Sequence, residues 1–124
     1  YELQLTQDKT SMTIDDILEK TQILVQTKSE HGSVVMLKEH GQIKNNDIPA
    51  AKVYSIKDPT GAGDAYRAGL IKGFFLSDSD IVHAAKIGAV TAAYSVEVYG
   101  PQNFNFTPES FNKRFEESFG EKAF

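Results

Sequence analysis

A short run of small residues that ends in an aspartate constrains this chain more than any other feature. Gly61-Ala62-Gly63-Asp64 follows a stretch at 52–56 in which polar and apolar residues alternate, and it opens a helix expected over about 61–76. Backbone N–H groups at a helix start have no intrahelical partner and carry the positive end of the helix dipole. Because glycine lets an anion approach these groups closely, the turn predicts a cradle for a phosphate.

Asp64 needs an explanation of its own, because a carboxylate in such a cradle would repel a phosphate. One explanation is chemical: Asp64 accepts a proton from a hydroxyl that attacks phosphorus. The other is structural: an acid in the first helical turn stabilises the helix by about 0.3–1 kcal/mol, and glycines permit a tight turn. The four residues alone favour the structural explanation, since short motifs often match by chance. The chain has neither a Walker A loop nor the third glycine of a dinucleotide fingerprint.

The composition is that of one globular domain over residues 1–124. A net charge of −4 argues against nucleic acid as the main partner. No apolar run approaches the roughly 18 residues of a membrane helix. Cysteine is absent, which suits a reducing compartment. We therefore expect a cytoplasmic protein with no nucleic-acid partner and no membrane partner.

Three further helix starts carry a capping side chain, an acid in the first turn and a hydrophobic staple. Thr13, Ser77 and Thr107 are the expected caps, which predicts helices over about 13–21, 78–97 and 108–118. Strands are expected at 22–27, for which a parallel arrangement is one option, at 33–38 and at 52–56, with a turn at 39–42 and a loop at 45–49. This mixture of helices and strands predicts a layered α/β domain.

The glycine turn is part of a longer run, Asp58-Pro59-Thr60-Gly61-Ala62-Gly63-Asp64-Ala65-Tyr66, which is followed by Ala68-Gly69. This run closely resembles the second signature of the ribokinase-like (phosphofructokinase-B type) sugar and nucleoside kinases. Residues 23–33 resemble the family's strand that ends in Thr-x-Gly-x-x-Gly, and 95–102 resemble its adenine-side helix and loop. Tyr1-Glu2 resembles the end of its Asn-x-x-Glu motif. The resemblance spans about 1–115 and implies the C-terminal part of a three-layer, Rossmann-like α/β fold with helices packed on a sheet.

The resemblance implies an activity: ATP-dependent transfer of a phosphoryl group to a hydroxymethyl group of a sugar or nucleoside. Asp64 would be the catalytic base. Gly61, Ala62 and Gly63 would hold the transferred group through their backbone N–H groups, and the two glycines would also contact ATP. Phosphoryl transfer needs positioning and charge stabilisation above all, which agrees with this arrangement.

The same resemblance implies the sites of the cofactors. Thr27 and Gly32 would lie along the wall that binds ATP. Glu2 would act on Mg²⁺ through water, and Asp58 and Thr60 would bind a monovalent cation such as K⁺. Hard cations prefer such oxygen ligands.

Some residues depart from the family pattern or have two interpretations. Ser29 stands where the family has its first glycine after the threonine, and its side chain narrows the approach to a phosphate. Arg67 is within reach of a phosphate, but a solvated arginine on an exposed helical face is the favoured interpretation. Phe111, Phe115 and Phe119 recur at helical spacing and predict a buried stripe.

Members of the family are more than twice as long as this chain, so we expect a piece of a longer protein. Its partner would then be the missing N-terminal half of the same protein, with a homodimer left open. The pattern at Val96, Glu97, Gly100 and Gln102 favours the nucleoside kinases of the family, such as adenosine kinase. The alternative is a catalytically inactive fragment or a nucleotide-binding module that keeps the kinase fold.

Overall fold

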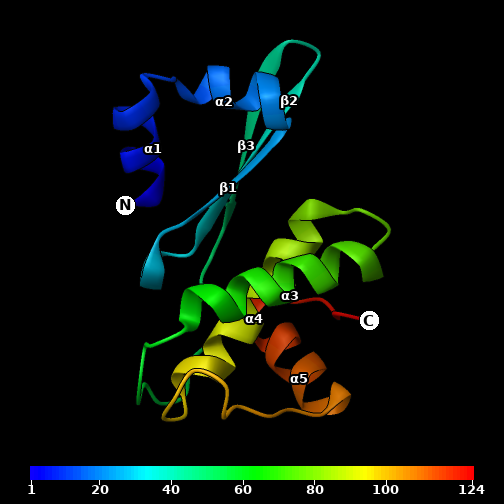
Figure 1. The fold of residues 1–124 in the computed structure, drawn as a ribbon. Coiled ribbons are helices and arrows are strands. Elements are labelled where there is room, and N and C mark those ends of the chain that lie inside the picture. Colours follow the sequence, from blue (N-terminus) through cyan, green and yellow to red (C-terminus); the bar gives the residue numbers. More distant parts are fainter.

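A three-stranded antiparallel sheet lies between two groups of helices in the computed structural model, which describes residues 1–124 (Figure 1). The strands are β1 (Ile23–Thr27), β2 (Ser33–Glu39) and β3 (Gln42–Ile48), in the order β1-β2-β3. The helices are α1 (Glu2–Thr10), α2 (Ile14–Thr21), α3 (Ala62–Leu76), α4 (Ile81–Val96) and α5 (Pro108–Phe119), and a short 3₁₀ turn, η1, covers Ser29–His31. The prediction of a layered α/β fold is confirmed.

The layers follow from the alternation of side chains along β2. Val35 packs in the main core together with α4 and α5, whereas Val34 and Met36 pack around Leu18 of α2 on the opposite face. Successive residues of a strand point to opposite faces of its sheet, so two hydrophobic neighbours serve two layers. The predicted phenylalanine stripe of α5 lies in the main core, where Phe111 and Phe115 are buried and Phe119 packs against them.

The strand predictions were wrong in three places. β1 runs antiparallel to β2, with Val25 opposite Val35, so the parallel arrangement does not occur in this sheet. β3 extends through the predicted loop at 45–49 to Ile48, because it is an edge strand and its polar residues can face water while its backbone pairs with β2. Residues 52–56 form no strand: the N–H of Lys52 donates to Ser118 Oγ, and that of Tyr54 donates to Glu97 Oε1.

The helix predictions are confirmed where the capping residue bonds to a residue three positions further along the chain. Thr13 caps α2, with its Oγ1 accepting from Asp16 N at 3.1 Å and its own N–H donating to Asp16 Oδ2 at 2.9 Å. Thr107 caps α5 in the same way through Ser110. Helix α1 was not predicted, and it has no buried residue to give an apolar pattern.

The predicted cap at Ser77 was wrong. Ser77 ends α3 and its Oγ donates to the carbonyl oxygen of Gly73 at 2.6 Å. Asp78 and Ser79 then take positive φ angles of 54° and 68°, which separate the two helices. Asp80 caps α4 instead, with its Oδ1 accepting from His83 N at 3.1 Å.

Helices α3 and α4 pack so closely that small residues are required between them. A Cβ on Gly69 would lie 2.4 Å from Thr91 Oγ1, and one on Gly88 would lie 2.8 Å from the carbonyl oxygen of Tyr66. This contact fixes the start of α3, and therefore the glycine turn before it, against α4.

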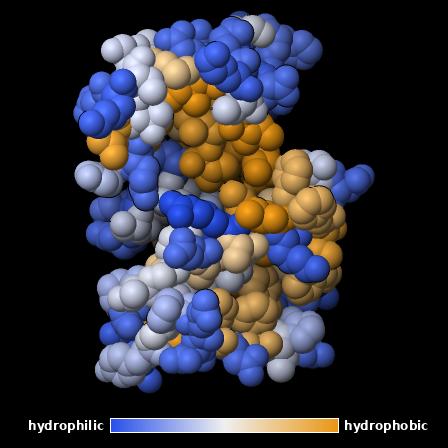
Figure 2. All heavy atoms as spheres, in the orientation of Figure 1, coloured by the Kyte–Doolittle hydropathy of each residue, from blue (hydrophilic) through white to orange (hydrophobic).

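Apolar surface remains exposed beside β1. Ile71 and Phe75 of α3 expose 60% and 79% of their surface. Figure 2 shows hydrophobic side chains gathered over the part of this face where α2, β1 and α3 lie. No helix is both long and apolar enough to span a bilayer.

Candidate functional site

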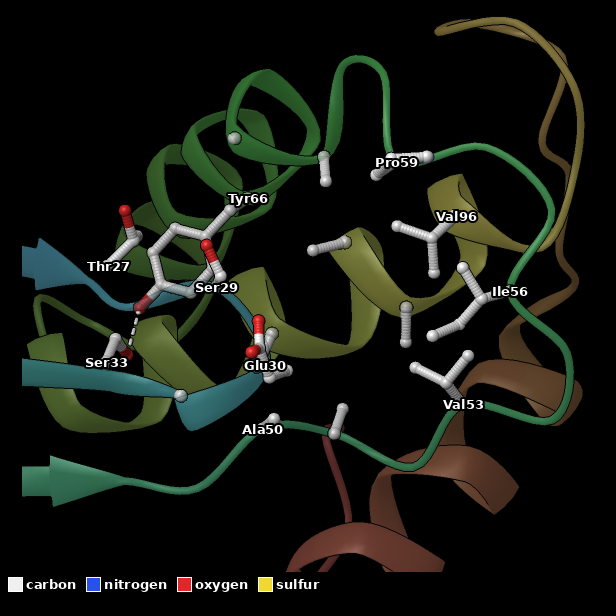
Figure 3. A pocket seen from close by; sticks show the side chains of 17 residues that line it. Thr27, Ser29, Glu30, Ser33, Ala50, Val53, Ile56, Pro59, Tyr66 and Val96 are labelled. Atoms are coloured by element: carbon white, nitrogen blue, oxygen red, sulfur yellow. Dashed lines mark hydrogen bonds between the residues drawn. The ribbon is translucent and has the colours of Figure 1, made fainter. Parts of the chain in front are cut away.

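The main cleft has a volume of about 390 Å³ and opens between η1, the segment after β3, and helices α3 and α4 (Figure 3). Ten of its seventeen lining residues are hydrophobic, which suits a flat, apolar ring. Figure 3 shows Val53, Ile56 and Val96 gathered at one end, whereas Thr27 and Ser29 lie at the other. The cleft therefore has an apolar end and a more polar end.

The glycine turn lies beside this cleft at the start of α3. Gly61 precedes the helix with a φ of 83°, a conformation that favours glycine, and a Cβ there would lie 2.6 Å from Pro101 Cβ. The N–H groups of Gly61, Gly63 and Asp64 have no hydrogen-bond partner in the protein, whereas that of Ala62 donates to Pro59 O at 3.2 Å. Three backbone donors therefore remain available to an anion. Two of them, Gly61 and Gly63, were predicted as donors. The third predicted donor, Ala62, is already bonded within the protein.

The carboxylate of Asp64 points to solvent rather than into the core. Its side chain is 84% exposed, and its Oδ1 accepts a hydrogen bond from Arg67 Nη1 at 3.0 Å. Arg67 Nη2 also lies 3.5 Å from Glu2 Oε1, so one guanidinium joins the predicted base to the predicted magnesium residue. The spacing of Asp64 and Arg67 on a helix could have indicated this pair, because residues three apart lie on the same face.

Thr27 and Gly32 both line the main cleft, as do Ala62 and Gly63. Gly32 has a φ of 86°, and a Cβ there would lie 2.2 Å from Ile48 O, so glycine is required at this turn. The turn that ends β1 and the turn that begins α3 thus lie on the walls of one cleft. Of the four residues predicted to contact ATP, Thr27, Gly32 and Gly63 therefore line one cleft, whereas Gly61 does not line it.

The other predicted site residues lie outside the main cleft. Glu2 lines a second cleft of about 270 Å³, which it shares with Thr27 and Arg67. Asp58 and Thr60 line neither cleft. No group of three or more histidine, cysteine or acidic side chains is placed to hold a metal ion.

Asp58 ties the segment before the glycine turn to the loop after α4. Its Oδ2 accepts from Gly100 N and its Oδ1 from Thr60 N, both at 3.0 Å. The hydrogen bond from the Gly100 backbone, together with those from Thr60, holds the pKa of Asp58 below its usual value. The N–H of Asp58 donates in turn to Val96 O at 3.1 Å. The neighbouring Ser95 has a buried hydroxyl without a hydrogen-bond partner, which adds an oxygen to this region.

The Asp58 tether predicts a pH dependence. The pKa of Asp58 in the folded protein lies below its unfolded value of 3.8. The stabilisation that the ionised Asp58 gives to the folded state is therefore complete above pH 3.8, and it is lost as the pH falls through the lower folded-state pKa. We expect the protection of the Gly100 amide from hydrogen exchange, measured relative to its intrinsic rate at each pH, to fall on acidification below pH 3.8, and Asp58→Asn to lower it already at neutral pH. Protection of the Gly100 amide that responds to neither change would contradict the tether.

Sequence reasoning missed one buried polar pair at the cleft. Ser33 Oγ and Tyr66 OH lie 2.7 Å apart, and Figure 3 shows them meeting beside Thr27. Burial raises the pKa of the Tyr66 phenol, so it stays protonated over the ordinary pH range. No local spacing links two residues this far apart in the chain.

Comparison with known proteins finds relatives along almost the whole chain. Residues 2–108 match the pfkB family of carbohydrate kinases. A nucleoside kinase of Methanocaldococcus jannaschii is 37% identical over 102 residues, which make up 82% of this chain and 32% of that protein. A ribokinase from Thermotoga maritima shares the fold, with a TM-score of 0.69 at 20% identity over 90% of this chain and 38% of its own.

The nucleoside kinase of Burkholderia thailandensis gives a higher structural similarity. Its complex with inosine superposes with a TM-score of 0.89 at 33% identity, over 98% of this chain and 39% of its own. Its complex with ADP-inosine gives a TM-score of 0.88. This chain thus spans between a third and two fifths of the length of these relatives. The family match covers most of its residues, and the chain therefore belongs to the pfkB family of carbohydrate kinases.

Proposed function

We propose that this chain is the nucleotide-binding, C-terminal part of an ATP-dependent kinase that phosphorylates a hydroxymethyl group of a nucleoside. The observation that carries the proposal is the set of unpaired N–H groups at the start of α3, beside the exposed carboxylate of Asp64 and next to a largely apolar cleft. The preference for a nucleoside over a simple sugar as the acceptor is supported by the two nucleoside kinases to which the chain is similar.

In this proposal Asp64 accepts the proton of the acceptor hydroxyl while the hydroxyl oxygen attacks phosphorus. The N–H groups of Gly61 and Gly63 donate to the phosphoryl oxygens and offset their charge, as fixed backbone dipoles do without reorganising. Thr27 and Gly32 lie along the phosphate end of the cleft, and Val53 and Ile56 along its apolar end. The apolar end would receive the adenine ring, which is flat and largely hydrophobic.

Two cations belong to the proposal. Glu2 would hold Mg²⁺ through water, which fits an exposed carboxylate, because Mg²⁺ in kinase sites keeps several waters and takes few protein ligands. Magnesium, when bound, neutralises charge on the phosphates of ATP. Asp58 and Thr60 would bind K⁺, and the unpartnered hydroxyl of Ser95 is a further oxygen suited to such an ion.

We propose further that the remainder of a longer polypeptide covers the apolar face formed by β1 and the exposed side of α3. The length of the relatives supports this, since each is more than twice as long as the stretch matched here. The free edge of β1 supports it as well, because an unpaired strand edge offers a row of backbone donors and acceptors. The acceptor pocket would lie mostly in that remainder.

The proposal is tested by measuring ADP release from Mg-ATP by the full-length protein with a panel of nucleosides and simple sugars, alongside calorimetric titration of Mg-ATP. We expect ADP release that depends on a nucleoside. Binding of ATP without release for any acceptor would favour the alternative, an inactive module that keeps the kinase fold. Absence of ATP binding would contradict both.

A further inference from the structure

The Ser33–Tyr66 pair connects the two turns that form the polar end of the main cleft. Ser33 directly follows Gly32 at the start of β2, and Tyr66 lies one helical turn after Gly63 on α3. The two hydroxyl oxygens are 2.7 Å apart, while the residues expose only 3% and 7% of their surface. This is the only side-chain hydrogen bond that spans the cleft between these turns.

Tyr66 itself is held from behind. Its carbonyl oxygen would lie 2.8 Å from a Cβ on Gly88, and its ring would lie 3.4 Å from the same atom. Helix α4 therefore packs directly against Tyr66 and prevents it from moving away from the cleft. Tyr66 and Thr27 both line the main cleft and the second cleft, so they form the wall between the two. A shift of the Tyr66 ring would therefore change the shape of the main cleft.

A buried hydroxyl pair of this kind is sensitive to the loss of one partner. Removing a single hydroxyl leaves the other buried without a hydrogen bond, whereas removing both leaves no polar group unsatisfied. Water cannot easily replace the missing partner, because both residues are almost completely buried. The segment that can yield is the turn at 28–32, most of which is exposed.

We propose that the Ser33–Tyr66 hydrogen bond sets the separation between the turn at 27–32 and the turn at 61–63, and that Tyr66 is thereby a positioning residue for the phosphates of ATP. This inference rests on the proposed function, because it assigns the phosphates to that end of the cleft. Tyr66 contacts no reacting atom in this proposal. It acts by holding Gly32 and Gly63 at the distance that suits one chain of phosphates.

The test uses Tyr66→Phe, Ser33→Ala and the double variant in the full-length protein. We expect each single substitution to raise the KM for ATP about five- to tenfold, with a smaller effect on the KM for the acceptor, and the double variant to be no worse than either one. Ser33→Thr keeps a hydroxyl and should restore most of the affinity. Tyr94→Phe is the matched control, since the Tyr94 hydroxyl makes no hydrogen bond and the residue does not line the cleft.

Hydrogen exchange separates this inference from the proposed function. The hydrogen-bonded amides of these two turns, Lys28, His31, Gly32 and Ala62, should exchange at least about fivefold faster in both single variants, and at the wild-type rate in Tyr94→Phe, whether or not the protein transfers phosphate. Unchanged exchange in these segments overturns the inference. So does faster exchange with an unchanged KM for ATP, because the pair would then be structural only. Absence of ATP turnover in the wild type would overturn the proposed function but not the role of the Ser33–Tyr66 hydrogen bond in setting the separation of the two turns.

Discussion

Replacing Asp64 with asparagine in the full-length protein is expected to lower kcat for phosphoryl transfer by about 10²–10⁴-fold, the range typical of general acid–base catalysis. The amide is nearly the same size as the carboxylate but cannot accept the proton of the acceptor hydroxyl. The affinity for ATP should change little, since the backbone N–H groups of the turn are retained. Steady-state kinetics together with calorimetric titration of Mg-ATP would measure both quantities.

The matched control for this variant is Asp47→Asn, which removes the same charge from an exposed position on the edge strand β3. It should leave kcat unchanged. If Asp64→Asn also left kcat unchanged and lowered only the free energy of unfolding, by a few tenths to 1 kcal/mol, Asp64 would be an ordinary acid at a helix start. That is the structural explanation that the four residues of the turn favour when taken alone.

The features that could be predicted from the sequence are those governed by neighbours in the chain. Thr13 and Thr107 cap their helices through residues three positions away, so the signal and the interaction lie in one short window. The glycine turn belongs to the same class, because its φ angle and its open N–H groups depend on a few consecutive residues. The candidate site was therefore located from a single motif.

The errors arise where a distant residue decides the outcome. Residues 52–56 alternate as a strand does, yet their backbone is held by Glu97 and Ser118 from the far end of the chain. The polar residues 45–47 resemble a loop, yet β2 supplies the pairing that makes them a strand. The Ser33–Tyr66 hydrogen bond and the one from Gly100 to Asp58 could not be predicted from the sequence for the same reason, because each joins residues far apart in the chain.

Arg114 forms the most extensive of these distant contacts and gives the second large prediction. It is 4% exposed, and its two terminal nitrogens donate to the two carboxylate oxygens of Glu97 at 2.8 and 3.1 Å. Its guanidinium also lies between two aromatic rings, 3.9 Å from the centre of Tyr54 and 4.3 Å from that of Tyr94. A carbonyl oxygen, that of Lys52, accepts a further hydrogen bond at 3.3 Å.

Arg114→Met is therefore expected to lower the free energy of unfolding by about 3–5 kcal/mol, because Glu97, whose side chain is only 15% exposed, is left as a largely buried charge without its partner. Urea denaturation of the full-length protein would measure this loss. The double variant Arg114→Met/Glu97→Leu should recover much of it, since it removes both buried charges together. Arg67→Ala, which breaks an exposed ion pair, should cost no more than about 1 kcal/mol.

The same contacts connect Arg114 to the apolar end of the cleft. Glu97 accepts the N–H of Tyr54 and Arg114 donates to Lys52 O, so the pair holds the segment from which Val53 and Ile56 line the cleft. Arg114→Lys keeps the charge but loses the two-point contact and the planar stacking. We expect this milder variant to stay folded and yet bind Mg-ATP more weakly, with the loss measured by calorimetry at a temperature well below its melting point. Wild-type affinity in a folded Arg114→Lys protein would show that the segment at 52–56 keeps its place without the two-point contact, and that Arg114 contributes to stability alone.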